Sequence, residues 1–181
     1  MKLVCYNEKG GSAKTSAVLA LCVPLGLPLL DLDPQATASR WLDRRDPPFP
    51  RATADDATWI ADCPPGISPS LTPILSVADL VLIPVKASFN DLITLPDTVR
   101  FITSNTGAKV AFLGCDIDSR TNDEQTLRET LEGYGIPLLG IFTHRASYRR
   151  AGLLGKLASE IDSVAAAESN EIIKNLRKFM K

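Results

Sequence analysis

The sequence predicts an α/β fold of three layers, in which helices cover both faces of a mostly parallel, twisted sheet. Two observations support this expectation. Short apolar runs alternate with longer segments of helical periodicity along the chain, and such alternation is typical of parallel strands joined by helical crossovers. In addition, the run LVLIPV at 80–85 is apolar without interruption, as expected for a strand that is buried on both faces.

The strands are predicted from short apolar runs bounded by turn-forming or charged residues, and runs of this length are ordinary for strands. In chain order they lie at 3–6, 27–32, 58–61, 80–85, 110–113 and 138–142. The proline-rich segment DPPFP at 46–50 interrupts the series and predicts a turn.

The helices are predicted from apolar residues at helical spacing between these strands. In chain order they lie at 15–23, 36–42, 92–102, 122–131, 147–157 and 171–180. Ser88 and Asp91 stand at capping-box spacing before the third helix, as Asn122 and Gln125 do at the start of the fourth. Because no linker or repeat interrupts the series, we expect a single domain over residues 1–181.

Composition restricts the function classes. The chain has 181 residues, 45% hydrophobic and 23% charged, with a formal net charge of -1. This excludes a polycation, so any binding to nucleic acid requires a local basic face. No signal peptide and no apolar stretch of about 20 residues is present, which predicts a cytoplasmic protein. The four cysteines form no CxxC pair, so buried free thiols are expected rather than a zinc or iron–sulfur site.

The segment KGGSAKT at 9–15 follows the first strand and opens the first helix, which is the context of a phosphate-binding loop. Its glycines let successive backbone N–H groups face one centre, and the helix N-terminus adds positive charge there. Lys14 can bridge the β- and γ-phosphates, and Thr15 can offer its hydroxyl to Mg²⁺. The residues expected to bind the nucleotide are Lys9, Gly10, Gly11, Ser12, Ala13, Lys14, Thr15 and Ser16.

Two carboxylates stand at alternate positions where the second strand ends. Asp31 and Asp33 in the segment LDLDPQ at 30–35 should point to the same side of the sheet. There they can orient a water molecule and meet the metal shell. Asp31 has an alternative role, in which its side chain only caps the strand end.

Four segments in a fixed order resemble the motifs of the ParA/MinD family of P-loop ATPases. They are KGGSAKT at 9–15, similar to the deviant Walker A box, DLDPQ at 31–35, DCPPG at 62–66, similar to Walker B and a switch, and ADLVLIPV at 78–85. Arg145 and Tyr148 resemble a later R-x-x-Y segment. The chain departs from the pattern at Ala13, where family members usually carry glycine.

The resemblance implies a three-layer P-loop NTPase fold that binds ATP or ADP with Mg²⁺. It implies weak, partner-stimulated ATP hydrolysis by a homodimer that forms on ATP binding, in which Lys9 reaches the partner subunit's nucleotide. Lys14 and Asp33 would act in catalysis, with Asp33 positioning the attacking water and Asp31 supporting it. The metal would be held by Thr15, Asp62 and Asp33, with Asp62 acting through water. A binding module with negligible turnover remains an alternative, since Ala13 crowds the loop.

The resemblance extends most closely to small plasmid-type ParA partition proteins. It implies a nucleoid-associated protein that segregates a plasmid or chromosome, binds double-stranded DNA without sequence preference and works with a small ParB-like centromere-binding partner. The basic residues expected to contact DNA are Arg149, Arg150, Lys156, Lys174, Arg177 and Lys178. A charge run is also compatible with an ordinary solvated face.

Two further functions remain open. MinD relatives end in an amphipathic membrane-targeting helix, and the last predicted helix carries an apolar stripe, formed by Ile172, Ile173, Leu176, Phe179 and Met180. Ordinary surface helices show the same stripe, so membrane binding is not the expected use. The same switch could also position a cargo other than DNA. The residues that contact adenine are not assigned by the sequence.

Overall fold

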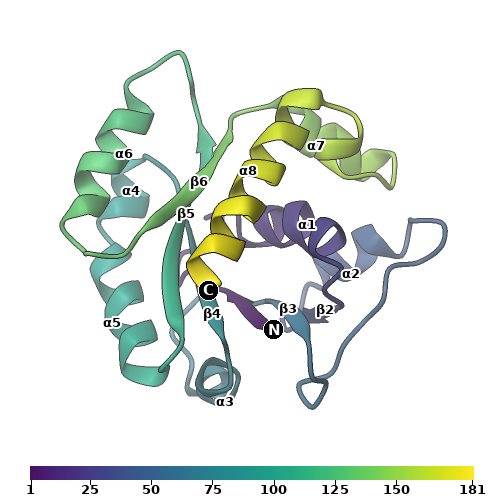
Figure 1. Ribbon diagram of the computed structural model, residues 1–181, viewed down its shortest axis with the longest axis horizontal. Helices are drawn as coiled ribbons and strands as arrows, with labels where there is room; N and C mark the ends of the chain where they lie inside the picture. Colours follow the sequence, from purple (N-terminus) through teal and green to yellow (C-terminus); the bar gives the residue numbers. More distant parts are fainter.

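Six parallel strands form one sheet in the order β2-β3-β1-β4-β5-β6 in the computed structural model, which describes all 181 residues (Figure 1). The strands are Lys2–Cys5 (β1), Leu29–Asp31 (β2), Trp59–Asp62 (β3), Leu80–Val85 (β4), Lys109–Ile117 (β5) and Leu138–Thr143 (β6). All six predicted strands are therefore present, and the predicted three-layer α/β fold is confirmed.

Eight α-helices connect or follow the strands. They are Lys14–Leu25 (α1), Thr37–Leu42 (α2), Thr72–Ser76 (α3), Phe89–Leu92 (α4), Leu95–Asn105 (α5), Asp123–Glu132 (α6), Ala146–Leu153 (α7) and Ser163–Met180 (α8). Two single turns of 3₁₀-helix lie at Pro69–Leu71 and Ala158–Glu160. Helices α1, α2, α7 and α8 lie on one side of the sheet, and α3, α4, α5 and α6 lie on the other (Figure 1).

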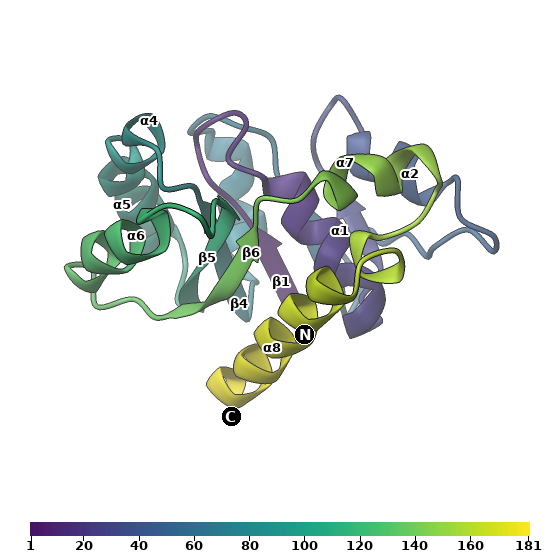
Figure 2. The ribbon, with the colours of Figure 1, turned by 90° about the horizontal axis from the view of Figure 1, so that it is seen from above.

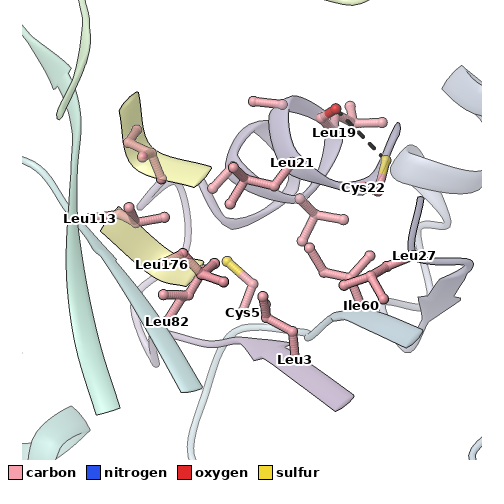
Figure 3. Packing of buried hydrophobic residues seen from close by; sticks show 14 of the residues in the cluster. Leu3, Cys5, Leu19, Leu21, Cys22, Leu27, Ile60, Leu82, Leu113 and Leu176 are labelled. Atoms are coloured by element: carbon pink, nitrogen blue, oxygen red, sulfur yellow. Dashed lines mark hydrogen bonds between the residues drawn. The ribbon is translucent and has the colours of Figure 1, made fainter. Parts of the chain in front are cut away.

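The hydrophobic core is divided between the two faces of the sheet, because side chains alternate in direction along each strand. Leu3 and Cys5 of β1 join Leu82 and helices α1 and α8 in one cluster of 24 buried residues (Figure 3). The intervening Val4 joins a second cluster of 18 buried residues, which includes residues of α3, α5 and α6. Successive side chains of a strand point to opposite faces, so the sheet is buried on both sides.

The register of the central strands brings their carboxyl ends together. Cys5 at the end of β1 is aligned with Asp62 at the end of β3 and with Leu82 in β4. The loop after β1 therefore begins beside Asp62. In open parallel sheets, ligands bind outside these carboxyl ends, and the candidate site lies there.

Some predicted helices have different boundaries. The segment predicted as one helix at 92–102 forms α4 and α5, and Ser88 caps α4 by accepting a hydrogen bond from the Asp91 amide. The last helix begins at Ser163 rather than 171, because Asp162 caps it and the small residues Ala165 and Ser169 form its buried face there. A search of the sequence for an apolar stripe does not detect a buried face that is made of small residues.

Other elements also differ from the prediction. Helix α3 is absent from the predicted series because it is only five residues long, and α7 ends at Leu153 rather than 157. The predicted capping box at α6 is wrong, since the Asn122 side chain makes no cap hydrogen bond and Gln125 instead donates to Glu129.

The apolar stripe of α8 packs on the domain. Ile172, Ile173 and Leu176 are at most 6% exposed, and Phe179 and Met180 pack partly buried against the same cluster. This stripe stabilises the fold and is not free to enter a bilayer. In addition, none of the helices combines the length and the apolar character that crossing a membrane requires.

Candidate nucleotide-binding site

A cavity of about 480 Å³ lies at the carboxyl edge of the sheet. It lies between the loop after β1, the ends of β5 and β6, and the segments that follow β2, β3, β4 and β6. The glycine-rich loop that is expected to bind phosphate forms one end of it. Six of the predicted nucleotide-binding residues line this cavity, namely Gly10, Gly11, Ala13, Lys14, Thr15 and Ser16. The structure thus brings most of the predicted loop residues to one concave surface.

Lys14 is held in place by the backbone of its own loop. Its Nζ donates hydrogen bonds to the carbonyl oxygens of Asn7 (2.9 Å) and Lys9 (3.0 Å). Burial lowers the pKa of Lys14, and the nearby Asp62 and Asp33 carboxylates act in the opposite direction. The ammonium is therefore fixed at the floor of the cavity, where a phosphate group would replace the two carbonyls as its partner.

Thr15 and Asp62 form the second feature of this end. Thr15 Oγ1 donates a 2.8 Å hydrogen bond to Asp62 Oδ2, while Oδ1 of the fully buried Asp62 has no partner. Burial raises the pKa of Asp62 to about 7, and repulsion from Asp31 and Asp33 adds to this effect. A carboxylate with a free oxygen beside a helix N-terminal hydroxyl fits Mg²⁺ held by Thr15 and, through water, by Asp62.

No group of three or more His, Cys, Asp or Glu side chains gathers at a potential metal site. Besides Thr15, Asp62 and the expected Asp33, such an ion would take phosphate oxygens and water as ligands, which Mg²⁺ commonly does beside nucleotides.

Asp31 and Asp33 occupy different positions. Asp33 lines the cavity, with its Oδ1 accepting a hydrogen bond from the Gln35 amide (2.9 Å). Asp31 lies outside the cavity, and its two oxygens accept hydrogen bonds from the amides of Asp33 (3.2 Å) and Ser39 (2.9 Å). This position agrees with the alternative role of Asp31 as a capping carboxylate, and its support of Asp33 in catalysis stays a prediction.

Lys9 and Ser12 also lie away from the cavity surface. Ser12 is fully buried, and its hydroxyl has no hydrogen-bond partner. Lys9 Nζ forms a 2.7 Å ion pair with Asp91 Oδ2 on α4 of the same chain. Within one subunit, therefore, Lys9 does not contribute to the pocket in which its own Lys14 lies.

Ala13 adopts a left-handed backbone conformation, with φ 72° and ψ 24°, immediately before α1. For a residue with a Cβ atom this conformation costs about 1–2 kcal/mol. The conformation explains why glycine is usual here among proteins that the sequence resembles. Because Ala13 also lines the cavity, its strain is located in the loop that would close around the phosphates.

Replacing Ala13 by glycine should therefore relieve this strain. We expect Ala13→Gly to raise the free energy of unfolding by roughly 0.5–1 kcal/mol and to tighten ATP binding, measured by denaturant unfolding and calorimetry. Ala36 is a matched control, since it is also left-handed, with φ 51°, but does not line the cavity. Ala36→Gly should stabilise the fold without changing ATP affinity. An Ala13→Gly variant with unchanged affinity would show that the methyl group does not impair the loop.

Sequence reasoning missed a charged cluster at the other end of the cavity. Lys86, Asp116 and His144 come from three neighbouring strand ends and line the cavity together. The Asp116 carboxylate is hydrogen-bonded to Lys86 Nζ (3.0 Å) and to His144 Nδ1 (2.6 Å). Although partial burial acts to raise it, the pKa of Asp116 lies below its usual value because these two groups hydrogen-bond the carboxylate. Only the strand order, which places β4, β5 and β6 side by side, brings these residues together, and no local sequence pattern indicates the cluster.

Arg145 and Tyr148 both line this end of the cavity. Arg145 Nε donates a 2.8 Å hydrogen bond to Asp162 Oδ2. The Tyr148 hydroxyl donates to Glu168 Oε2 at 3.2 Å, and Glu168 also accepts a hydrogen bond from the Thr143 amide. Acidic groups at the start of α8 therefore fix the side chains that face the cavity.

The predicted DNA-binding residues fall into two separate groups. Arg149 and Arg150 are exposed on α7 and line a groove of about 770 Å³ beside the cavity, and Lys156 follows the same helix. The second group lies in the last turns of α8, roughly 20 Å from its start, and comprises Lys174, Arg177 and Lys178. Figure 2 shows that this end of α8 points away from α7. The structure thus places only the first group beside the candidate nucleotide site.

No family model matches the chain. Over 171 residues it is 27% identical to the maintenance of carboxysome distribution protein A of Gloeobacter kilaueensis, covering 82% of this chain and 79% of that protein. Among solved structures, apo McdA from Cyanothece superposes with a TM-score of 0.80 at 15% identity, covering 96% of this chain and 98% of that one.

Two further structures contain nucleotides. A protein assigned to plasmid partition in Borrelia burgdorferi B31, bound to AMPPNP, superposes with a TM-score of 0.79 at 15% identity, covering 97% of this chain and 98% of that one. The septum site-determining protein MinD of Pyrococcus horikoshii, complexed with Mg-ADP, gives 0.75 at 14% identity, covering 98% and 96%. These similarities agree with the three-layer P-loop fold predicted from the sequence.

Proposed function

We propose that the chain is an ATP-hydrolysing positioning switch of the ParA/MinD family of P-loop ATPases, which its motifs and its similarity to such proteins support. In this proposal it binds ATP with Mg²⁺, dimerises around the nucleotide and then binds DNA without sequence preference. The observation that carries the proposal is the cavity, where Lys14, Thr15 and Asp33 line one end. Arg149 of the basic helix α7 lines the same cavity.

Each residue at the end of the cavity formed by the loop after β1 would have a separate role in hydrolysis. Lys14 would neutralise the β- and γ-phosphates, with its ammonium already fixed by the loop. Thr15 and Asp62 would hold Mg²⁺, which when bound draws charge from the phosphate oxygens. Asp33 has one carboxylate oxygen bonded to the Gln35 amide, which leaves the other to orient the attacking water. The nucleoside would then lie at the far end of the cavity, beside the charged cluster.

The proposal links DNA binding to the nucleotide through α7. Arg149 lines both the cavity and the adjoining groove, and Arg150 lines the groove. Neither arginine has an ion-pair partner, whereas Arg120 and Arg145 in the same groove are paired with Asp118 and Asp162. Two such faces brought together in a dimer would bind a duplex much more tightly than one face.

The cargo has two candidates. Partition of a plasmid or chromosome, assisted by a small ParB-like centromere-binding partner, is the function predicted by the motifs. Distribution of a large protein body is favoured by the similarity to the carboxysome distribution protein of Gloeobacter kilaueensis. Both candidates use the same ATP-driven switch and differ in the cargo and in the partner that stimulates hydrolysis.

The role of Asp33 provides the test of this function. Because orienting water matters mainly in the transition state, we expect Asp33→Ala to retain ATP binding, accumulate the ATP dimer and slow turnover by roughly 100-fold. Light scattering and phosphate release measure these effects. Asp31→Ala is the matched comparison and should mainly reduce stability. Turnover at the parent rate in Asp33→Ala would contradict the assignment. In cells, loss of replicon inheritance or of protein-body spacing in this variant identifies the cargo.

A further inference from the structure

An ion pair with Asp91 restrains Lys9. In the proposed function, this lysine contacts the nucleotide of the partner subunit. Lys9 Nζ lies 2.7 Å from Asp91 Oδ2, and the Asp91 side chain is 2% exposed. The same oxygen accepts a short hydrogen bond from the Ser88 hydroxyl, while Asp91 Oδ1 has no partner. Lys9 is the only ion-pair partner of this carboxylate.

Removing the only cationic partner of a buried carboxylate is strongly unfavourable, because it leaves an unpaired charge in the protein interior. The pair therefore favours a conformation in which the Lys9 ammonium stays in its own subunit. An ammonium that reaches the phosphates of a second subunit must direct donors away from Asp91, so dimerisation as proposed weakens or opens the pair.

The backbone of Lys9 is held by the same loop. Its amide donates to Asn7 Oδ1 (2.9 Å), and its carbonyl accepts from Lys14 Nζ (3.0 Å). Asn7 is in turn anchored to the Pro84 carbonyl (2.8 Å). A phosphate group that takes the Lys14 ammonium removes one of these restraints on Lys9. Nucleotide binding is thereby coupled to the stability of the Lys9–Asp91 pair.

The helix that carries Asp91 is accessible from outside. Phe89 on α4 is 77% exposed, and Ile93 directly after it is 60% exposed. These two apolar side chains are one helical turn apart on the segment that holds Lys9. A second copy approaching this surface would meet the ion pair and the exposed side chains together.

We propose that Asp91 is a positioning residue that latches Lys9 within its own subunit and releases it when phosphate groups engage Lys14. This inference rests on the proposed function, in which Lys9 contacts the partner subunit's nucleotide. The latch keeps the nucleotide-free protein monomeric, because the free energy of opening the pair is added to the cost of dimerisation.

The test compares dimerisation of four variants with a non-hydrolysable ATP analogue, measured by analytical ultracentrifugation. We expect Asp91→Asn to dimerise at roughly tenfold lower protein concentration than the parent chain. Asp97→Asn, a change in an exposed carboxylate on the adjoining helix, should match the parent. Lys9→Ala should remain monomeric, and so should the double variant Lys9→Ala with Asp91→Asn. A merely structural role for Asp91 would not produce this dependence on Lys9.

A folded Asp91→Asn variant that dimerises like the parent, or less readily, would overturn the latch. A second measurement covers the cases in which this variant fails to fold or the parent does not dimerise. The rate of Lys9 acylation by an amine reagent, followed by mass spectrometry, should be low in the nucleotide-free monomer and rise when ADP occupies the loop. An unchanged rate with bound ADP overturns the latch, whereas a parent chain that never dimerises with the analogue contradicts only the proposed function.

Discussion

Lys14→Ala is expected to lose ATP binding while the chain remains folded. The Lys14 ammonium is buried at the cavity floor and makes two hydrogen bonds to loop carbonyls, so its position is already set before a nucleotide arrives. A hydrogen bond to a charged group contributes about 1.5–3 kcal/mol, and Lys14 would contact two phosphates. We therefore expect ATP affinity to fall by roughly 100-fold or more.

Calorimetry with ATP and Mg²⁺ measures this loss. Lys2→Ala is a suitable control, because Lys2 is a lysine of the same chain that lies over Trp59, away from the cavity. The control should bind ATP like the parent. Thermal unfolding must accompany the titration, since removing Lys14 leaves the carbonyls of Asn7 and Lys9 without this donor. A folded Lys14→Ala variant with parent affinity would refute the assignment of the phosphate-binding loop.

The double substitution Arg149→Glu with Arg150→Glu is expected to abolish DNA binding and to leave ATP-driven dimerisation intact. Both side chains are exposed on α7 and have no acidic partner, while the whole chain has a net charge of only -1. Their electrostatic field is therefore local. Phosphate contacts of this kind ignore sequence, and they weaken as the salt concentration rises because releasing DNA counterions into a more concentrated solution is less favourable.

Anisotropy titrations with two unrelated duplexes at two salt concentrations test this expectation. The parent should bind both duplexes equally, only with ATP, and with an affinity that falls steeply with salt. Lys174→Glu with Arg177→Glu is the matched control, since it makes the same charge change at the far end of α8. If this control loses binding and the α7 variant does not, the DNA surface lies on α8. Binding of the parent to anionic liposomes but to no duplex would instead favour a membrane-associated switch.

Sequence reasoning alone was sufficient for the fold class, the six strands and the glycine-rich loop between β1 and α1. Each of these depends on a local pattern: an apolar run for a strand such as β4, and a glycine-rich turn between strand and helix for the loop. Such signals lie in consecutive residues, because backbone conformation and helix N-terminal charge are set over a few positions.

The tertiary structure decided which of the singled-out residues share a site. Asp31 and Asp33 look equivalent in the sequence, but the turn into α2 directs only Asp33 to the cavity. Lys86, Asp116 and His144 are far apart along the chain, and only the order of strands β4, β5 and β6 brings them together. The contact between Lys9 and Asp91 likewise spans 82 positions. Packing of distant segments determines these contacts, and no local pattern in the chain contains that information.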